Sequence, residues 1–554
     1  MMDRKKIRWN GWGWAEHSNP LANDEKVWSW LAGELGVASL PSTPARKLEG
    51  ITLPPSQLSA DDRAKFVSLL GAEQVRDDNY ERAFHALGRS YFDLLRLRAG
   101  DLSVAPDAVL YPRSTDDVLA ILSFASDREI AVVPFGGGTS VVGGVSAARG
   151  KFKSVLTVDL SLMDKLVGVD PVARIATAQS GIYGPALDKA LATQGLTLGH
   201  YPQSFEFSTL GGWIAHRGSG QQSGRYGRAE NWLAGVKLAT PTGLLSTDDF
   251  PASAAGPHLA DLAVGSEGIF GIVTEARMHI QPVPDVRDYY GFLFRDFETG
   301  AEAVREVKQQ NISTAMLRLS DAEETRFYRA FSGLGKAKGL RGDIENLFLR
   351  SRGLAGKPSV LIAGFEGSRE ETDAAFEKLN KITGKFSALA LGKGQGQRWF
   401  EGRFHGPYMR DPMMDRGVGV DTLETATRWP NIKRLHAAVR NALETSMAAT
   451  LPRGARGIVM GHISHVYRDG ASLYFTYIFP RANDEIAQWR KIKTAASDAI
   501  AANGGTISHH HGVGEDHLPW IKQEKGELGI EILRAIKRTL DPKGVLNPGK
   551  LIPN

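Results

Sequence analysis

The sequence predicts an α+β protein with a two-part α/β domain, an antiparallel-sheet domain and a helical N-terminal region. A chain of 554 residues exceeds what one hydrophobic core supports, so two or three domains are expected. From Pro106, patterns typical of strands and helices alternate, as in α/β domains. After the Pro-Val-Pro sequence at 282–284 the order becomes β-α-β-β-α-β, which favours an antiparallel sheet with helices on one side.

These changes of pattern divide the chain into four segments. Residues 1–100 form a largely helical N-terminal segment, and residues 101–284 form the α/β domain. Residues 285–500 form the antiparallel-sheet domain, which we interpret as a cap over a substrate. Residues 501–554 end in a turn-rich stretch, and we expect them to return to the α/β domain.

Individual elements follow from local signals. Trp9, Trp12 and Trp14 are interrupted by glycines, so this stretch is expected to pack on a later domain rather than form a helix. Caps and periodicity predict helices over 59–71, after Ser114, and over 185–195, 300–310 and 368–383. Short apolar or alternating runs predict strands over 130–133, 155–159, 175–178, 292–294, 316–319, 360–365, 387–391 and 473–477.

Composition excludes several classes of protein. No apolar run approaches the roughly 20 residues that a membrane span needs. The absence of cysteine excludes disulfides, thiolate nucleophiles and cysteine metal ligands. A net charge of +5 is too small for this length to indicate nucleic-acid binding. Neither a secretory signal nor a peroxisomal tripeptide is evident, so we expect a cytoplasmic protein, with peripheral membrane contact through basic residues 4–9 left open.

A glycine-rich loop at 134–144 is the most informative stretch. It follows the buried strand predicted at 130–133, and consecutive glycines let backbone N–H groups approach a ligand. Concave rows of such amides bind anions, above all a pyrophosphate. The loop is neither a Walker loop nor a dinucleotide fingerprint. The predicted cofactor-binding residues here are Pro134, Phe135, Gly136, Gly137, Gly138, Thr139, Ser140 and Val141.

Acid–base chemistry is indicated near the C-terminus. In the predicted strand 473–477, Tyr474 and Phe475 point to opposite faces, and a tyrosine facing a ligand can transfer a proton. The adjacent residues His509, His510 and His511 can act as acid, base or metal ligand. Three neighbours in an extended segment cannot all point one way, so we favour an acid–base role over a metal site or a structural role and assign no metal.

Together these stretches resemble the vanillyl-alcohol oxidase superfamily of flavoproteins, and within it the alkyldihydroxyacetonephosphate synthase (alkylglycerone-phosphate synthase) family. Residues 134–141, 206–213 and 268–273 carry the superfamily likeness, whereas Trp-Asn-Gly-Trp-Gly at 9–13 and the triple histidine are specific to this branch. The resemblance spans nearly the whole chain. It implies a two-part FAD-binding domain of the superfamily type, with further FAD contacts from His200, Gln203, Ser204, Ser208, Thr209, Gly212, Glu267, Gly268, Gly271, Ile272 and Val273.

The resemblance also implies a reaction. The family exchanges the acyl group of an acyl-dihydroxyacetone phosphate for a fatty alcohol through a flavin N5 adduct, in ether-lipid synthesis. Arg410 resembles the arginine that holds the substrate phosphate, a role that charge-assisted pairing suits. Tyr474 and His510 match proton-transfer residues, and His509 and His511 complete the catalytic set. Thr422, Arg318, His462 and His465 are the other expected substrate-binding residues.

Two departures keep an alternative open. The family usually has an arginine and a glutamine where this chain has His462 and His465. The stretch 461–465 is reminiscent of a motif in D-lactate and glycolate dehydrogenases, some of which bind a metal there. The alternative is therefore an FAD-dependent oxidoreductase acting on a D-2-hydroxy acid or related alcohol, and a third hypothesis is a flavin-binding protein without catalysis. The expected partner is a lipid-like small molecule, and a homodimer is left open.

Overall fold

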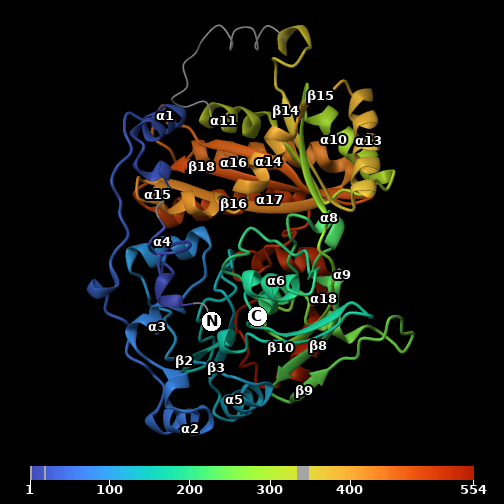
Figure 1. The fold of residues 1–554 in the computed structure, drawn as a ribbon. Helices are drawn as coiled ribbons and strands as arrows, with labels where there is room; N and C mark the ends of the chain where they lie inside the picture. Colours follow the sequence, from blue (N-terminus) through green and yellow to red (C-terminus); the bar gives the residue numbers. More distant parts are fainter. Residues whose placement is uncertain (1–2, 18–19, 333–348, 554) are drawn as a thin grey trace.

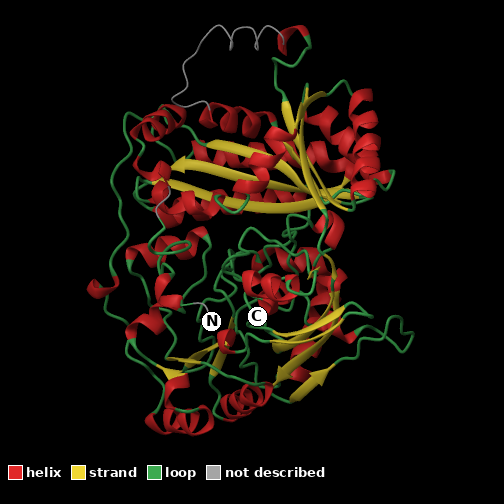
Figure 2. Ribbon diagram, viewed as in Figure 1, coloured by secondary structure: helices red, strands yellow, loops and turns green. Residues whose placement is uncertain are grey.

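The structure is a computed structural model that describes residues 3–17, 20–332 and 349–553 (Figures 1 and 2). The lower body in Figure 1 contains a four-stranded and a five-stranded sheet, and the upper body contains a seven-stranded sheet. Both chain ends lie in the lower body. Parallel pairs in the four-stranded sheet and antiparallel pairing in the five- and seven-stranded sheets, with helices around them, confirm the predicted α+β class. A separate two-stranded antiparallel sheet is also present.

The four-stranded sheet carries the glycine loop at the end of one strand. Its order is β1-β2-β4-β3, in which β2, β4 and β3 run parallel. The predicted strands at 130–133 and 155–159 are confirmed, and Ser114 caps the helix that follows it by accepting the N–H of Asp117. The bounds are β1 Val75–Arg76, β2 Ala108–Leu110, α5 Thr115–Asp127, β3 Ala131–Phe135 and β4 Val155–Asp159.

The five-stranded sheet is antiparallel and has the order β5-β6-β10-β8-β9. Short helices and loops connect its strands, and the predicted cofactor residues 200–212 lie in these connections. The bounds are β5 Leu166–Asp170, β6 Ile175–Gln179, α6 Gly184–Ala192, β7 Leu196–Thr197, α7 Leu210–Ala215, α8 Ser223–Tyr226, α9 Ala229–Trp232, β8 Leu233–Thr240, β9 Gly243–Ser246, β10 Ile272–His279 and β11 Gln281–Pro282.

The upper body is organised around an antiparallel sheet of order β15-β12-β14-β13-β17-β18-β16. Its strands are β12 Val286–Phe294, β13 Met316–Ser320, β14 Ser359–Gly367, β15 Leu389–Gly392, β16 Val418–Arg428, β17 Ile458–Val466 and β18 Gly470–Pro480. Its helices are α10 Phe297–Gln309, α11 Ala322–Ser332, α13 Arg369–Lys385, α14 Lys393–Gly402, α15 Arg410–Met414, α16 Ile432–Ala448 and α17 Glu485–Ala502.

Two expectations about this sheet are wrong. Helix α11 lies between β13 and β14, where a direct connection of two strands was expected. Helices also cover both faces of the sheet. One face packs Leu361 and Phe475 against α10 and α16, and the other packs Met460 against Phe327 of α11 and Leu31 of α1 (Glu25–Leu35). Both faces are therefore buried, which explains why the strands read as apolar runs.

The N-terminal tryptophan stretch packs on later parts of the chain, as expected. The backbone N–H of Trp12 donates to Asp411 Oδ2 at 2.8 Å, and its ring meets Phe207 edge-on. Gly13 has a φ of +79°, and a Cβ there would lie 2.2 Å from the ring of Tyr408. The helices of this segment are α1, α2 Ala60–Leu70, α3 Asn79–Phe84 and α4 Tyr91–Ala99.

The last residues of the chain pack against the glycine-loop strand. Leu546 forms a parallel bridge with Val132. The side chain of Asn547 donates to the carbonyl oxygens of Gly144 and Glu267, at 3.0 and 2.6 Å. Helix α18 (Leu518–Leu540), with a kink at Gly526, leads to this segment. The chain end thereby holds two of the predicted cofactor stretches together.

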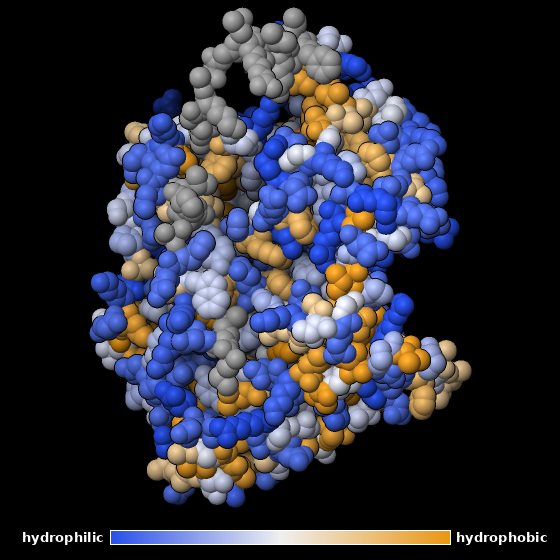
Figure 3. Space-filling model, in the orientation of Figure 1, coloured by the Kyte–Doolittle hydropathy of each residue, from blue (hydrophilic) through white to orange (hydrophobic). Residues whose placement is uncertain are grey.

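Within the described residues, we find no helix that has both the length and the apolar character needed to cross a membrane. On the face shown in Figure 3, polar residues cover much of the surface and apolar residues form separate groups. Large apolar side chains with high exposure include Phe250, at 73%, and Leu528, at 75%.

Asp93 supplies the first testable prediction. It closes the capping box of α4 with Ser90, and burial raises its pKa to about 6. Between about pH 4 and 6 the unfolded carboxyl ionises while the folded one keeps its proton, so stability falls as pH rises, by about 3 kcal/mol in total. Asp93→Asn retains an oxygen that can cap the helix but carries no charge. The unfolding temperature of the variant should therefore exceed that of the wild type at neutral pH and not at acidic pH. Thermal unfolding followed by fluorescence measures this.

Asp101→Asn is the matched control for Asp93→Asn. Asp101 is exposed and pairs with Arg96, and the bonds from Arg96 and Ser103 outweigh burial and hold the pKa of Asp101 below its usual value. Loss of the Asp101 carboxylate should therefore destabilise the protein more at neutral pH than at acidic pH, which is the opposite of the trend expected for Asp93→Asn. Equal shifts for Asp93→Asn at both pH values would contradict a buried, proton-retaining carboxyl.

Candidate active site

The glycine loop begins where β3 ends and lies directly against the segment 207–209. A Cβ on Gly137 would lie 1.7 Å from the carbonyl oxygen of Phe207, and one on Gly136 would lie 2.3 Å from Thr209 Oγ1. Gly138 has a φ of +69°, a conformation that glycine adopts without strain. Glycine is thus required here for close packing, and the loop and the 207–209 segment form one continuous surface.

The residues around this surface fit a cofactor rich in hydrogen-bonding groups. Among the described residues, several buried polar atoms here have no hydrogen-bond partner: Ser180 Oγ, His200 Nε2, Thr209 Oγ1, His216 Nδ1 and Asn547 Oδ1. Buried polar atoms without partners are costly, and a bound ligand is one explanation for them. Burial lowers the pKa of His200 to about 3, so its ring is neutral and can accept or donate a hydrogen bond.

Other predicted cofactor residues are committed to protein contacts. Ser208 Oγ accepts from the indole of Trp213 at 2.7 Å, and the amide of Gln203, which is exposed, donates to the carbonyl of Arg403 at 2.6 Å. The carboxylate of Glu267 accepts the backbone N–H groups of Val513 and Gly514, at 2.5 and 2.7 Å. Glu267 therefore joins the 265–273 stretch to the histidine loop, and its carboxylate is committed to that contact.

Three residues form a row across the cap sheet. Antiparallel pairing sets His462 on β17 opposite Tyr474 on β18, and Tyr474 opposite Glu424 on β16. The rings of His462 and Tyr474 stack with centroids 5.0 Å apart, and the ring of His511 lies edge-on to Tyr474 at 5.6 Å. Burial raises the pKa of Tyr474 to about 12, and hydrogen bonding with Thr422 opposes this rise. The structure thus brings together four of the predicted residues.

Arg318 occupies the next position beyond His462. Its Nη1 lies 3.0 Å from His462 Nε2, and its Nη2 donates to Glu324 Oε1 at 2.8 Å. Burial opposes ionisation of Glu324, but the charge of Arg318 and the contact with His462 hold its pKa at about 2. Burial also lowers the pKa of His462. Arg318 is therefore neutralised by Glu324 and orients His462.

Arg410 is a cation near Tyr474 that keeps its guanidinium available. It begins α15, and its Nη1 donates to the carbonyl of Arg89 at 2.9 Å. Its positive charge acts on Tyr474 by lowering the pKa of that phenol, against the effect of burial. Across the described residues, no carboxylate lies within ion-pair distance of Arg410. The guanidinium can therefore pair with an anionic substrate group.

His509 and His510 face Glu424, whereas His511 faces Tyr474. His509 Nδ1 lies 3.3 Å from Glu424 Oε2, and His510 Nδ1 contacts the same oxygen. Sequence analysis did not identify Glu424. The available signal was an acidic residue between Leu423 and Thr425 in a strand whose neighbouring positions are buried, because a buried charge requires a partner.

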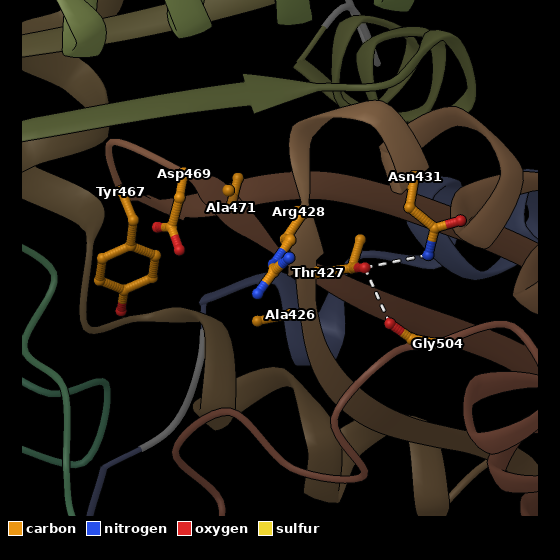
Figure 4. Close-up of a pocket in the computed structure, with 9 residues that line it drawn as sticks. Ala426, Thr427, Arg428, Asn431, Tyr467, Asp469, Ala471 and Gly504 are labelled. Carbon is orange, nitrogen blue, oxygen red and sulfur yellow. Dashed lines mark hydrogen bonds between the residues drawn. The ribbon is translucent and has the colours of Figure 1, made fainter.

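A polar cavity of about 430 Å³ opens at the ends of β16 and β18 (Figure 4). None of the predicted site residues is among the side chains that line it, so we do not assign it to the substrate. The phenol of Tyr467 lines this cavity and hydrogen-bonds His509 Nε2 at 2.6 Å. The lining residues are Ala426, Thr427, Arg428, Asn431, Tyr467, Asp469, Gly470, Ala471 and Gly504.

Comparison with known families first gives the class. Residues 106–248 match a family model described as "FAD binding domain", and residues 283–551 match "FAD linked oxidases, C-terminal domain". A solved structure of 4-ethylphenol oxidase from Gulosibacter chungangensis has the same fold, with a TM-score of 0.68 and 16% identity over 90% of this chain and 98% of its own. The protein is thus an FAD-dependent enzyme with an FAD-binding domain and the C-terminal domain of FAD-linked oxidases, and the FAD cofactor is as the sequence predicted.

More similar relatives identify the family. Alkyldihydroxyacetonephosphate synthase of Dictyostelium discoideum is 32% identical over 579 residues, which cover 99% of this chain and 94% of that protein. A solved structure of an alkyldihydroxyacetonephosphate synthase superposes with a TM-score of 0.85 at 31% identity and covers 100% of both chains. The chain belongs to the alkyldihydroxyacetonephosphate synthase family, which confirms the resemblance drawn from the motifs.

FAD is expected to be bound without a covalent bond. Covalent attachment in this superfamily commonly uses a histidine in the glycine-loop region or a cysteine elsewhere, and this chain has neither. Precipitation with trichloroacetic acid should therefore leave the yellow flavin in the supernatant. A yellow pellet that fluoresces after proteolysis would contradict this prediction.

Proposed function

We propose that this protein exchanges the acyl group of an acyl-dihydroxyacetone phosphate for a fatty alcohol and so forms an ether lipid precursor. The ester C–O bond breaks with loss of the fatty acid, and a new C–O bond to the alcohol forms, with no net oxidation. The observation that supports this most directly is the guanidinium of Arg410, which pairs with no carboxylate among the residues that the structure describes and acts electrostatically on Tyr474. The full-length relationship to the synthases supports it further.

Each residue has a defined task in this proposal. FAD bound against the glycine loop would supply an electrophilic ring beside the substrate carbon. Arg410 pairs with the substrate phosphate and fixes its position. Tyr474, held between His462 and His511, moves the proton at the carbon next to the ketone. Arg318 keeps the ring of His462 in place.

The lipid-like substrate agrees with the family to which the chain belongs. The fatty alcohol and the acyl chain are apolar, so only the phosphate end needs a charged partner, and Arg410 provides it. Peripheral membrane association and a homodimer stay predictions.

The decisive assay uses the FAD-loaded protein with acyl-dihydroxyacetone phosphate and a labelled fatty alcohol, without oxygen or an electron acceptor. Labelled ether product supports the proposal. Anaerobic bleaching of the flavin by D-2-hydroxy acids, with no ether formed, would reject it in favour of the oxidoreductase alternative.

Arg410→Ala should raise KM for the phosphate substrate about 30-fold. This follows because a hydrogen bond to a charged group contributes roughly 2 kcal/mol. A neutral, dephosphorylated analogue should be affected little, and Arg428→Ala, which removes an exposed arginine at the end of β16, should change neither KM. Equal effects of Arg410→Ala on charged and neutral substrates would contradict a phosphate site.

A further inference from the structure

Four side chains lie close together and offer nitrogen and oxygen ligands, and one of them, Glu424, also belongs to the row with Tyr474 and His462. One ligand atom from each of Glu424, His465, His509 and His510 lies within 4.8 Å of the other three. Glu424 Oε1 is 4.0 Å from His465 Nε2, and the Nδ1 atoms of His509 and His510 are 3.3 Å apart. No other group of this kind was found in the described parts of the chain.

Neighbouring hydroxyls orient three of these side chains from behind. Tyr467 contacts Nε2 of His509 at 2.6 Å, and Ser223 contacts Nδ1 of His465 at 2.9 Å. Ser464 donates to Glu424 Oε1 at 2.6 Å. Nδ1 of His509, Nε2 of His465 and Oε2 of Glu424 are therefore the atoms that point into the cluster. Such hydrogen bonds to the far side of ligating histidines are typical of metal sites, because they fix the ring and its tautomer.

Charge and burial are also those of a cation site. Glu424, His465 and His509 are buried, with side chains at most 9% exposed. Nδ1 of His509 and Nδ1 of His510 both face Glu424 Oε2. A buried carboxylate surrounded by imidazole rings gains from a bound cation.

We propose that Glu424, His465, His509 and His510 bind one divalent transition-metal ion, for which Zn²⁺ is the best match. Three imidazole nitrogens and one carboxylate oxygen are a four-ligand set that suits Zn²⁺, whereas Mg²⁺ and Ca²⁺ prefer oxygen ligands. The cavity lined by Tyr467 and Asp469 provides an approach from solvent next to His509. This site lies beyond the proposed ether-forming reaction and is independent of its substrate.

The ion would fasten the histidine loop to the cap sheet. It would join residues 509 and 510 to β16 and β17, which are otherwise linked to this loop by few hydrogen bonds such as that from His509 N to Glu424 O. Coordination through Nδ1 would leave Nε2 of His510 as the ring atom that can carry a proton. The metal therefore acts as a positioning element for the loop that presents His511 to Tyr474.

The test is metal analysis of the FAD-loaded protein, purified without an affinity tag and without chelators. Inductively coupled plasma mass spectrometry should find about one Zn²⁺ per chain, or one after incubation with zinc and dialysis. Glu424→Gln and His465→Gln should each lower this content at least tenfold. His436→Gln is the matched control, because His436 on α16 pairs with Asp321, just after β13, outside the cluster, and it should retain the metal.

The ratio of flavin absorbance to protein concentration checks that each variant is folded. Neither the metal content nor this ratio depends on ether formation. Cobalt substitution of the wild type needs no variant and should give d–d absorption bands typical of tetrahedral Co²⁺, to the red of the flavin. Wild-type protein that stays metal-free after incubation with zinc would overturn the proposal in favour of a hydrogen-bonded histidine network. Loss of metal in His436→Gln as well would overturn the assignment of the site.

Discussion

Replacing Tyr474 by phenylalanine should lower the rate of ether formation about 10²–10⁴-fold, the range expected when a proton-transfer group is removed. The ring should keep its stacking on His462, so the fold and FAD content should stay unchanged. Because only the hydroxyl is lost, the effect should fall on kcat rather than on KM for the phosphate substrate. Steady-state assays with labelled alcohol, together with flavin absorbance, measure both quantities.

Tyr477→Phe is the control for this experiment. Tyr477 lies on the same strand, but its hydroxyl donates to the buried Asp421 at 2.8 Å. Loss of that bond should cost about 1–3 kcal/mol of stability and leave kcat near the wild-type value. If Tyr474→Phe retained full turnover, Tyr474 would be a packing residue and the proton would have to move through another group.

Gly137→Ala should remove FAD from the protein. The added Cβ would lie 1.7 Å from the carbonyl oxygen of Phe207, a distance that only backbone movement can relieve. Overpacking of this kind costs about 3 kcal/mol or more, which corresponds to a loss of affinity of at least about 100-fold if the strain is expressed at the cofactor site. Flavin absorbance after gel filtration and an FAD titration of the apoprotein measure this.

Gly168→Ala provides the comparison for Gly137→Ala. Gly168 lies in β5, and no atom lies within 4 Å of a Cβ built there. This variant should bind FAD like the wild type. Normal flavin content in Gly137→Ala would mean that the loop and the 207–209 segment separate easily and do not form a rigid surface.

The two histidines that depart from the usual family pattern have different partners in the structure. His462 is held by Arg318 and Glu324 beside Tyr474. His465 instead contacts Ser223 and lies 4.0 Å from Glu424. A break in the pairing of β17 between Ile463 and Val466 changes the direction of the strand between them. Their proximity in sequence therefore does not make them one catalytic pair.

Much of the fold could be predicted because the signals are local. Ser59, Ser114 and Ser368 each accept a backbone N–H at the start of a helix, as their sequence positions indicate. The glycine loop after 130–133 follows from the apolar strand and from glycine itself. Helix α11 and the covered second face of the cap sheet were not predicted, because burial of a face depends on what packs there. Leu31 and Phe327, which cover it, come from distant parts of the chain.

The sequence by itself determined the cofactor and the family, because the FAD-binding stretches and the triple histidine are contiguous motifs whose backbone chemistry is local. Only the tertiary structure decided which side chains act together. Glu424, Tyr474 and His462 lie on three strands, and the antiparallel register alone sets them in one row. The return of the loop that carries His509 and His510 to this sheet brings both of them, with His465 of β17, to Glu424. Residue spacing cannot reveal such a cluster, because the distance between two side chains across a sheet depends on strand order and register.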